Sequence, residues 1–176
     1  LLATGGVGQV YQYHTNAEHA YGSGLAAANR ARVRIINARF VQFHPTALWT
    51  KQEGRRFLIS EALRGEGARL MNKKGEYFMG PYPLKDLESR AVVARAVMRE
   101  MQKTRTDHVS LNLADFYSPS PNTPQFAAEN SARYPAASRG KLHQGKISIR
   151  ERFPGIYEEC KKQGIDIEKE PIPVVP

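Results

Sequence analysis

The chain has 176 residues, of which 26 are Lys or Arg and 17 are Asp or Glu, so its formal charge is +9. This length suits one domain, or one domain with part of a second, and a content of 41% apolar and 24% charged residues excludes disordered and fibrous classes of protein. No run of 18 apolar residues is present, so we expect no membrane segment. A single cysteine, Cys160, excludes an internal disulfide and a cysteine-based zinc site. We therefore expect a cytoplasmic protein without a metal.

The basic charge raises nucleic-acid binding as a hypothesis. The basic residues are dispersed, however, and the densest group, Arg30, Arg32 and Arg34, is interleaved with Ala, Val and Ile. The sequence contains no RNA-binding ribonucleoprotein motif, zinc finger or GXXG loop. We therefore disfavour nucleic acid as the partner.

The first residues, 1–8, have the pattern of a buried strand that runs into a glycine turn. Their glycines do not complete the dinucleotide fingerprint, because the sixth position counted from Gly6 is Tyr11. A chain that opens inside a strand suggests a piece of a longer protein. Gly22 to Gly24 then lead into a predicted helix over residues 25–31.

The middle of the chain predicts short strands and one long helix. Alternation predicts a strand over residues 39–43 that ends at His44, and an apolar run predicts a short buried strand over 57–59. Ser89 is a credible N-cap for an amphipathic helix from Arg90 to about Lys103. The remaining predicted elements are a hairpin over residues 70–78 with its turn at 72–75, and a half-buried strand over 109–113.

The last third begins with a long irregular loop, predicted over residues 118–145 from its four prolines. An amphipathic stretch follows over residues 149–160, and Pro154 should divide it into two short helices. Gly164 is the expected C-terminal cap. Residues 171–176 are predicted to be extended.

Three polar features in apolar surroundings are candidates for chemistry. His44 stands at the end of a predicted strand; Glu61 and Arg64 lie three residues apart, so they can pair on one face of a helical turn. Arg90 opens a helix, where a cation is unfavourable unless an anion such as a ligand carboxylate or Glu88 lies beside it. Each feature also has an ordinary alternative: a structural histidine, a surface ion pair and a solvated arginine.

The motifs become specific when they are taken in order. The sequence runs through Ala3-Thr4-Gly5-Gly6, Phe43-His44-Pro45-Thr46, Ser60-Glu61-Ala62-Leu63-Arg64-Gly65-Glu66-Gly67, Ser89-Arg90 and the tail Pro171-Ile172-Pro173-Val174-Val175-Pro176. This order resembles the flavoprotein family that comprises the L-aspartate oxidases and the flavoprotein subunits of succinate dehydrogenase and fumarate reductase. The tail is most similar to that of the oxidases. The resemblance covers nearly the whole chain, apart from residues 115–146, which have the character of an insertion.

The resemblance implies an α+β fold: a capping domain of an FAD-dependent oxidoreductase together with the end of an α/β, Rossmann-like FAD-binding domain. Residues 1–38 would be the last stretch of the first FAD-binding segment, and residues 39–176 the capping, substrate domain. The family's glycine-rich fingerprint would lie upstream, and a further substrate-binding His and Arg downstream. We therefore expect a fragment that is inactive alone.

The resemblance also implies the site. His44 and Ser60 would bind a C4-dicarboxylate (L-aspartate, fumarate or succinate), Arg90 would be catalytic, and Glu61 with Arg64 would form a proton relay. The reaction would be hydride transfer from a substrate carbon to the flavin, which turns L-aspartate into iminoaspartate for NAD biosynthesis. The residues expected to contact FAD are Ala3, Thr4, Gly5, Gly6, Gly22 and Gly24.

Two departures from the family pattern and two alternatives stand beside this expectation. Ser23 and Ala91 occupy positions where the family usually has Asp, so part of the FAD contact and the orientation of Arg90 are in question. The first alternative is a succinate dehydrogenase or fumarate reductase flavoprotein, which would work with an iron–sulfur subunit. The second is a non-catalytic remnant of the fold.

Overall fold

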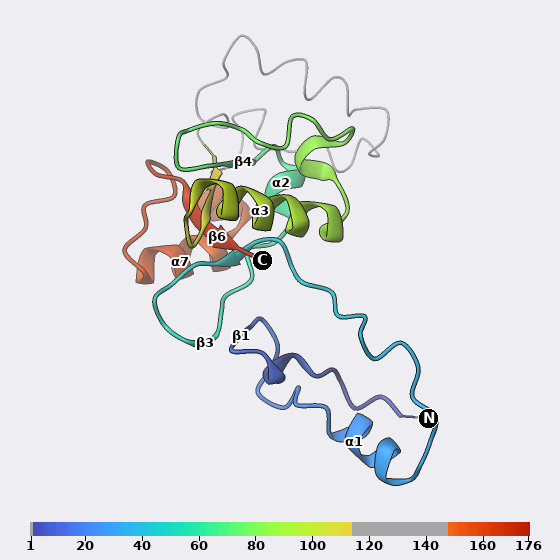
Figure 1. The fold of residues 1–176 in the computed structure, drawn as a ribbon. Helices are drawn as coiled ribbons and strands as arrows, with labels where there is room; N and C mark the ends of the chain where they lie inside the picture. Colours follow the sequence, from blue (N-terminus) through green and yellow to red (C-terminus); the bar gives the residue numbers. More distant parts are fainter. Residues whose placement is uncertain (1, 114–147) are drawn as a thin grey trace.

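The structure, a computed structural model, describes residues 2–113 and 148–176 and divides them into a sheet body and an arm. Figure 1 shows the arm, residues 2–43, beside the body and joined to it by extended chain. The elements of the arm are η1 (Gly8–Val10), β1 (Tyr13–His14) and α1 (Ser23–Arg30). The elements of the body are β2 (Ala47–Leu48), β3 (Gly54–Arg55), α2 (Ala62–Gly65), β4 (Arg69–Met71), η2 (Lys85–Leu87), α3 (Arg90–Thr104), β5 (Val109–Asn112), α6 (Ile149–Arg152), α7 (Pro154–Lys162) and β6 (Ile172–Val175).

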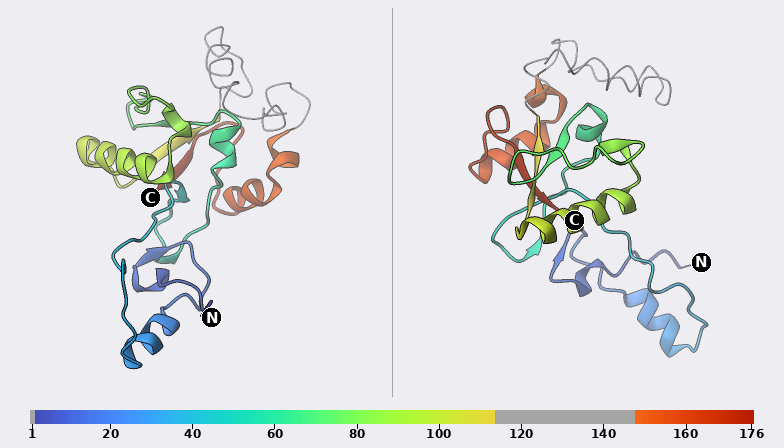
Figure 2. Two further views of the ribbon diagram at one scale, coloured as in Figure 1. Left: turned by 90° about the vertical axis from the view of Figure 1, so that its right-hand side faces the viewer. Right: turned by 45° about the horizontal axis from the view of Figure 1, so that its top comes forward.

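A four-stranded antiparallel sheet in the order β2-β6-β5-β4 organises the body. The C-terminal strand β6 lies between β2 and β5, with Ile172 opposite Leu111 and Val174 opposite both Val109 and Leu48. Figure 2 (left) shows α3 on one side of this sheet and α6 and α7 on the other. The described elements thus form a mixed helix and sheet fold.

The core forms because each element turns its apolar residues to the sheet. In β5 burial alternates strictly, and Val109 and Leu111 are at most 1% exposed. In α3 the buried residues recur at helical spacing, among them Val93 and Val97. Cys160 of α7 is also buried, and burial raises the pKa of its thiol to about 12. This thiol therefore stays protonated and serves as a small apolar core group.

Several local predictions are confirmed. The long helix runs from Arg90 to Thr104 with Ser89 at its N-cap, although the Ser89 side chain makes no capping hydrogen bond. The hairpin forms around Gly75, whose φ of 82° requires the left-handed conformation that glycine adopts readily. Pro154 begins α7 directly after α6, and Gly164 (φ 78°) follows the end of α7. The tail is extended, as β6.

Two predicted strands are wrong. Residues 2–8 and 39–43 form no ladder in the described part of the chain, and Leu2 and Phe40 are both 70% exposed. The alternation of residues 39–43 is compatible with a strand, but a strand also needs a neighbour to pair with its backbone. The buried strand over 57–59 is confirmed only in part, since Leu58 makes an isolated bridge to Ala47 and Ile59 is fully buried. The loop predicted over residues 118–145, with the proposed insertion at 115–146, lies outside the described residues.

Several contacts connect the arm to the body. Strand β1 pairs with β3 in parallel, with Tyr13 opposite Gly54 and His14 opposite Arg55. A cavity of about 60 Å³ is lined by residues of the arm, including Tyr13 and Gln42, and by His44 and Arg56 of the body. No helix in the described ranges is long and apolar enough to cross a membrane.

Candidate active site

The arm brings two glycine segments together, and we call Thr4–Gly6 with Gly22–Gly24 the glycine corner. The Gly22 N–H donates to the Gly6 carbonyl at 3.1 Å. A Cβ built on Gly24 would lie 1.8 Å from Oγ1 of Thr4, so only glycine lets α1 approach this loop so closely. Gly5 and Gly6 have open space where a Cβ would stand.

The glycine corner fits part of a flavin. Backbone without side chains, open on one side, can lie against a flat ring system, and such an approach is a recurrent use of glycine. Ala3 to Gly6 are exposed, so this backbone is accessible to a ligand. The residues present thus fit FAD along one stretch of the cofactor.

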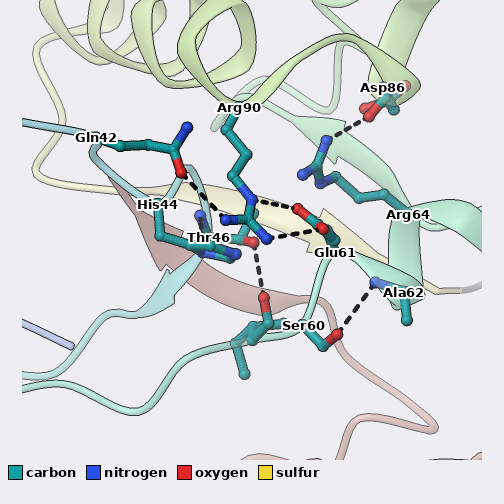
Figure 3. A network of polar contacts seen from close by, with 10 residues as sticks. Gln42, His44, Thr46, Ser60, Glu61, Ala62, Arg64, Asp86 and Arg90 are labelled. Atoms are coloured by element: carbon teal, nitrogen blue, oxygen red, sulfur yellow. Dashed lines mark hydrogen bonds and ion pairs between the residues drawn. The ribbon is translucent and has the colours of Figure 1, made fainter. Parts of the chain in front are cut away.

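Arg90 lies at the centre of a second polar cluster, which is on the body and includes one residue of the arm, Gln42. Its Nε donates to Oε2 of Glu61 at 2.6 Å, and its Nη2 donates to Oε1 of Glu61 at 2.9 Å. Its Nη1 donates to Oε1 of Gln42 at 3.2 Å. Figure 3 shows these contacts around the guanidinium, with His44 beside them. The anion that a cation at the start of a helix needs is therefore Glu61, the N-cap residue of α2.

This ion pair shifts the pKa of both partners toward the charged forms. The hydrogen bond from Arg90 lowers the pKa of Glu61, and the same contact raises the pKa of Arg90. At neutral pH, Glu61 is therefore a carboxylate and Arg90 a cation. The two side chains are 48% and 43% exposed, so both face a surface that a ligand can reach.

His44 lies at the end of the extended segment that leads into β2. Its Nδ1 accepts the Thr46 N–H at 3.3 Å, while Oγ1 of Thr46 donates to the carbonyl of Ile59 at 2.8 Å. Burial lowers the pKa of His44, and the charges of Arg90 and Arg64 lower it further. The imidazole is therefore neutral at pH 7, and because Nδ1 accepts, Nε2 carries the proton. His44 can donate one hydrogen bond from Nε2.

Ser60 and Arg64 flank Glu61 in the chain and differ in exposure. Oγ of Ser60 accepts the Ala62 N–H at 3.2 Å at the start of α2, which leaves its own O–H able to donate. Arg64 is only 3% exposed, and its Nη1 donates to the backbone carbonyl of Asp86. The spacing suggested a pair between Glu61 and Arg64; the structure gives Glu61 two bonds to Arg90 instead, with Arg64 close enough to lower the pKa of Glu61.

The structure thus brings His44, Glu61, Arg64 and Arg90 into one cluster, with Ser60 at its margin (Figure 3). The glycine corner lies apart from this cluster, in the arm. Sequence reasoning missed Gln42 and Asp86. Gln42 carried a weak signal, as a polar residue between Val41 and Phe43 next to His44, whereas nothing in the sequence distinguished Asp86.

Comparison with known proteins identifies the family. The chain matches the FAD binding domain family over residues 1–176. It is 40% identical to L-aspartate oxidase 1 of Ralstonia nicotianae and 40% identical to L-aspartate oxidase of Nostoc sp., each over 177 residues and 100% of this chain. It spans only 28% and 26% of the lengths of those two relatives.

Solved structures lead to the same family. A structure titled quinol-fumarate reductase with menaquinol molecules matches with a TM-score of 0.71 and 30% identity over 99% of this chain and 28% of its own. Mycobacterium smegmatis Sdh1 in complex with UQ1 matches with a TM-score of 0.64 and 30% identity over 98% of this chain and 25% of its own. The chain therefore belongs to the FAD-binding domain family of oxidoreductases, and its cofactor is FAD.

Proposed function

We propose that the chain is a segment of an FAD-dependent oxidase that converts L-aspartate to iminoaspartate. The observation that carries this proposal is the position of Arg90, which Glu61 and Gln42 hold beside the neutral His44 on an accessible face. Residues 1–38 would complete the FAD-binding part and residues 39–176 would form the cap over the substrate. The division of the structure into an arm and a sheet body supports a boundary near there.

The substrate carboxylates would be held by three donors. A guanidinium has five N–H groups, and Arg90 uses three of them on Glu61 and Gln42, which leaves two for a carboxylate. Nε2–H of His44 and the hydroxyl of Ser60 each supply one more hydrogen bond. Charge-assisted bonds of this kind both bind and orient a diacid.

The redox chemistry belongs to the cofactor: FAD, when bound, accepts the hydride that leaves the substrate carbon. The amino nitrogen loses a proton as the carbon–nitrogen double bond forms, so L-aspartate gives up one hydride and one proton. Arg90 resists deprotonation, and its pair with Glu61 strengthens that resistance. Arg90 therefore serves as an anchor, while Glu61 and Arg64 remain the proposed route for the proton.

The alternative is a flavoprotein subunit of succinate dehydrogenase or fumarate reductase, which would pass electrons to an iron–sulfur subunit. The solved structures favour it, because their titles name a fumarate reductase and an Sdh1. The curated relatives favour the oxidase, with identities of 34–40% over the whole chain. Both activities use a four-carbon diacid.

Two chimeras distinguish these functions. In one, residues 1–176 replace the matching segment of the Ralstonia L-aspartate oxidase 1; in the other, they replace that of a fumarate reductase flavoprotein. We expect the first chimera to bind FAD and to show flavin bleaching by L-aspartate under anaerobic conditions. Activity restored only in the second chimera would favour the alternative, and FAD binding without activity in either would favour a non-catalytic remnant.

The isolated chain offers a simpler test of how much of the FAD-binding site this segment supplies. Because the glycine corner would contact only one stretch of FAD, we expect the 176-residue chain, purified alone, to hold little flavin. Absorbance at the flavin bands measures this content. A yellow product with one FAD per chain would contradict the expectation.

A further inference from the structure

A partly buried cation, Arg56, lies where the arm meets the body. Strand β1 pairs with β3 at this junction (Figure 1), and the Arg56 N–H donates to the His14 carbonyl at 2.8 Å. The side chains of both residues line the cavity of about 60 Å³. One water needs about 10–15 Å³ on this scale, so the cavity has room for roughly four waters or for a ligand group of similar size.

Two side-chain nitrogens at this place are buried and make no hydrogen bond with the described residues. They are Nδ1 of His14 and Nε of Arg56. Nε of an arginine always carries a proton and can only donate, whereas Nδ1 of a histidine donates in one neutral tautomer and in the charged ring. A buried donor without an acceptor is unfavourable, and proteins generally give such donors a partner. The two nitrogens therefore favour an acceptor at this place.

The charge of Arg56 indicates what kind of acceptor fits. Its guanidinium lies over the Tyr13 ring, with Cζ 4.0 Å from the ring centroid, and it makes no ion pair with a carboxylate of residues 2–113 or 148–176. None of the described residues that line the cavity is Asp or Glu. Burial lowers the pKa of Arg56, and only Tyr13 opposes this shift. A cation removed from water in this way is stabilised by an anionic partner.

We propose that this cavity binds a small oxyanion, a carboxylate or a phosphate group, which the Arg56 guanidinium holds with Nδ1–H of His14 as a second donor. The planar fork of a guanidinium matches two oxygens of either group. The formal charge of +9 on the whole chain favours the approach of anions in general. We call this cavity the Arg56 site.

The Arg56 site adjoins the proposed diacid site but is separate from its ion pair. Gln42 and His44 line the cavity, whereas Glu61 and Arg90 do not. An anion in the Arg56 site would therefore share a wall with His44 without using the donors of Arg90. The inference goes beyond the proposed function, because the Arg56 site needs neither FAD nor turnover to bind an anion.

The test is an NMR titration of the 176-residue chain, without FAD, in which the Nε–H signal of Arg56 reports binding directly. Sodium phosphate, sodium acetate and sodium succinate are added separately at constant ionic strength. Phosphate represents a free inorganic anion, acetate a single carboxylate and succinate a diacid. Isothermal titration calorimetry gives the dissociation constants, and circular dichroism checks the fold of each variant.

Three variants locate the binding. Arg56→Gln removes the guanidinium and its charge, and His14→Phe keeps a ring but removes the second donor. Arg55→Gln is the matched control, because Arg55 is the neighbouring arginine, is exposed and does not line the cavity.

We expect at least one of the three anions to bind with a dissociation constant in the millimolar range and to shift the Nε–H signal of Arg56. Arg56→Gln should weaken this binding about tenfold or more, because hydrogen bonds to a charged group are among the stronger ones. His14→Phe should weaken it severalfold, and Arg55→Gln should leave it near the wild-type value. A preference for phosphate would identify a free inorganic anion as the ligand, and a preference for acetate or succinate would identify a carboxylate.

Three results would overturn the proposal. One is that no anion shifts the Arg56 signal, and another is that folded Arg56→Gln binds as tightly as the wild type. The third is an equal loss of binding in Arg55→Gln and Arg56→Gln, because the anions would then respond to general surface charge. If Arg56→Gln does not fold, the Nε–H titration of the wild-type chain decides alone. Because neither flavin nor turnover is measured, failure of the oxidase assignment leaves the result intact.

Discussion

Replacement of Arg90 by alanine separates a structural role from a chemical one. The change removes three hydrogen bonds, two of them to the Glu61 carboxylate. Both members of this ion pair are more than two-fifths exposed, at 43% and 48%, and exposed pairs of this kind contribute roughly 0.2–1 kcal/mol. We therefore expect Arg90→Ala to reduce the free energy of unfolding by less than about 1 kcal/mol, as measured by urea denaturation of the 176-residue chain.

The same change should have a much larger effect on turnover. Loss of one preorganised donor to developing or bound negative charge typically costs about 10²–10³-fold in kcat, and Arg90 presents two N–H groups to the substrate by our count. We expect at least that loss in the L-aspartate oxidase chimera, measured as L-aspartate-dependent hydrogen peroxide formation. Flavin content should stay nearly unchanged, because the glycine corner is in the arm.

The matched control is Arg95→Ala, which removes an exposed arginine from the same helix. It should retain both activity and flavin. Turnover close to wild type in Arg90→Ala would remove Arg90 from the site, and a simultaneous loss of flavin would mean that the two clusters are not separate as described.

Two further changes test the remaining parts of the site. His44→Gln should raise the KM for the diacid and should flatten the pH dependence of stability. Burial lowers the pKa of His44 in the folded chain below its unfolded value of 6.5. Between the folded and the unfolded pKa the unfolded chain binds more protons, so wild-type stability falls as the pH decreases through this range. Urea denaturation of both proteins at pH 7 and pH 5 measures the difference, and equal losses of stability in the two proteins would contradict this. Gly24→Ala should lower both stability, by about 1–3 kcal/mol, and FAD content, because its Cβ would meet Thr4 at 1.8 Å. Gly155→Ala, with nothing within 4 Å, is the control, and equal behaviour of the two alanine variants in thermal melts would refute the steric argument.

Local features of the fold could be predicted because their signals lie within a few residues. The helix Arg90–Thr104 follows from an N-cap residue and an apolar period, and the hairpin follows from a turn with Gly75. The strand order could not be predicted in this way. β6 inserts between β2 and β5, and its partners Leu48 and Leu111 lie more than 60 residues away in the chain. No local pattern specifies such a pairing, which depends on how the whole sheet buries its faces.

The candidate site shows the same limit. The types of residue were visible in the sequence, but the partner of Glu61 was not. A spacing of three favours Arg64 if a regular helix continues, yet α2 is only four residues long and Glu61 is its N-cap. The short helix directs Arg64 into the interior, toward Asp86, and leaves Glu61 at the surface for an arginine 29 positions away. Tertiary packing therefore decided a contact that the local rule assigned elsewhere.

The orientation of Arg90 bears on the departure at Ala91, where the family usually has an aspartate. Without a carboxylate at position 91, the guanidinium of Arg90 could be free to rotate unless other groups hold it. In the structure, Nε and Nη2 both bond Glu61, and Nη1 bonds Gln42. A planar group held at two edges by two different segments has its plane and its direction fixed without a second anion. Ala91 is exposed, and alanine favours the helix that begins at Arg90. Alanine at position 91 is therefore compatible with an anchoring role for Arg90, whose orientation depends on Glu61 and Gln42.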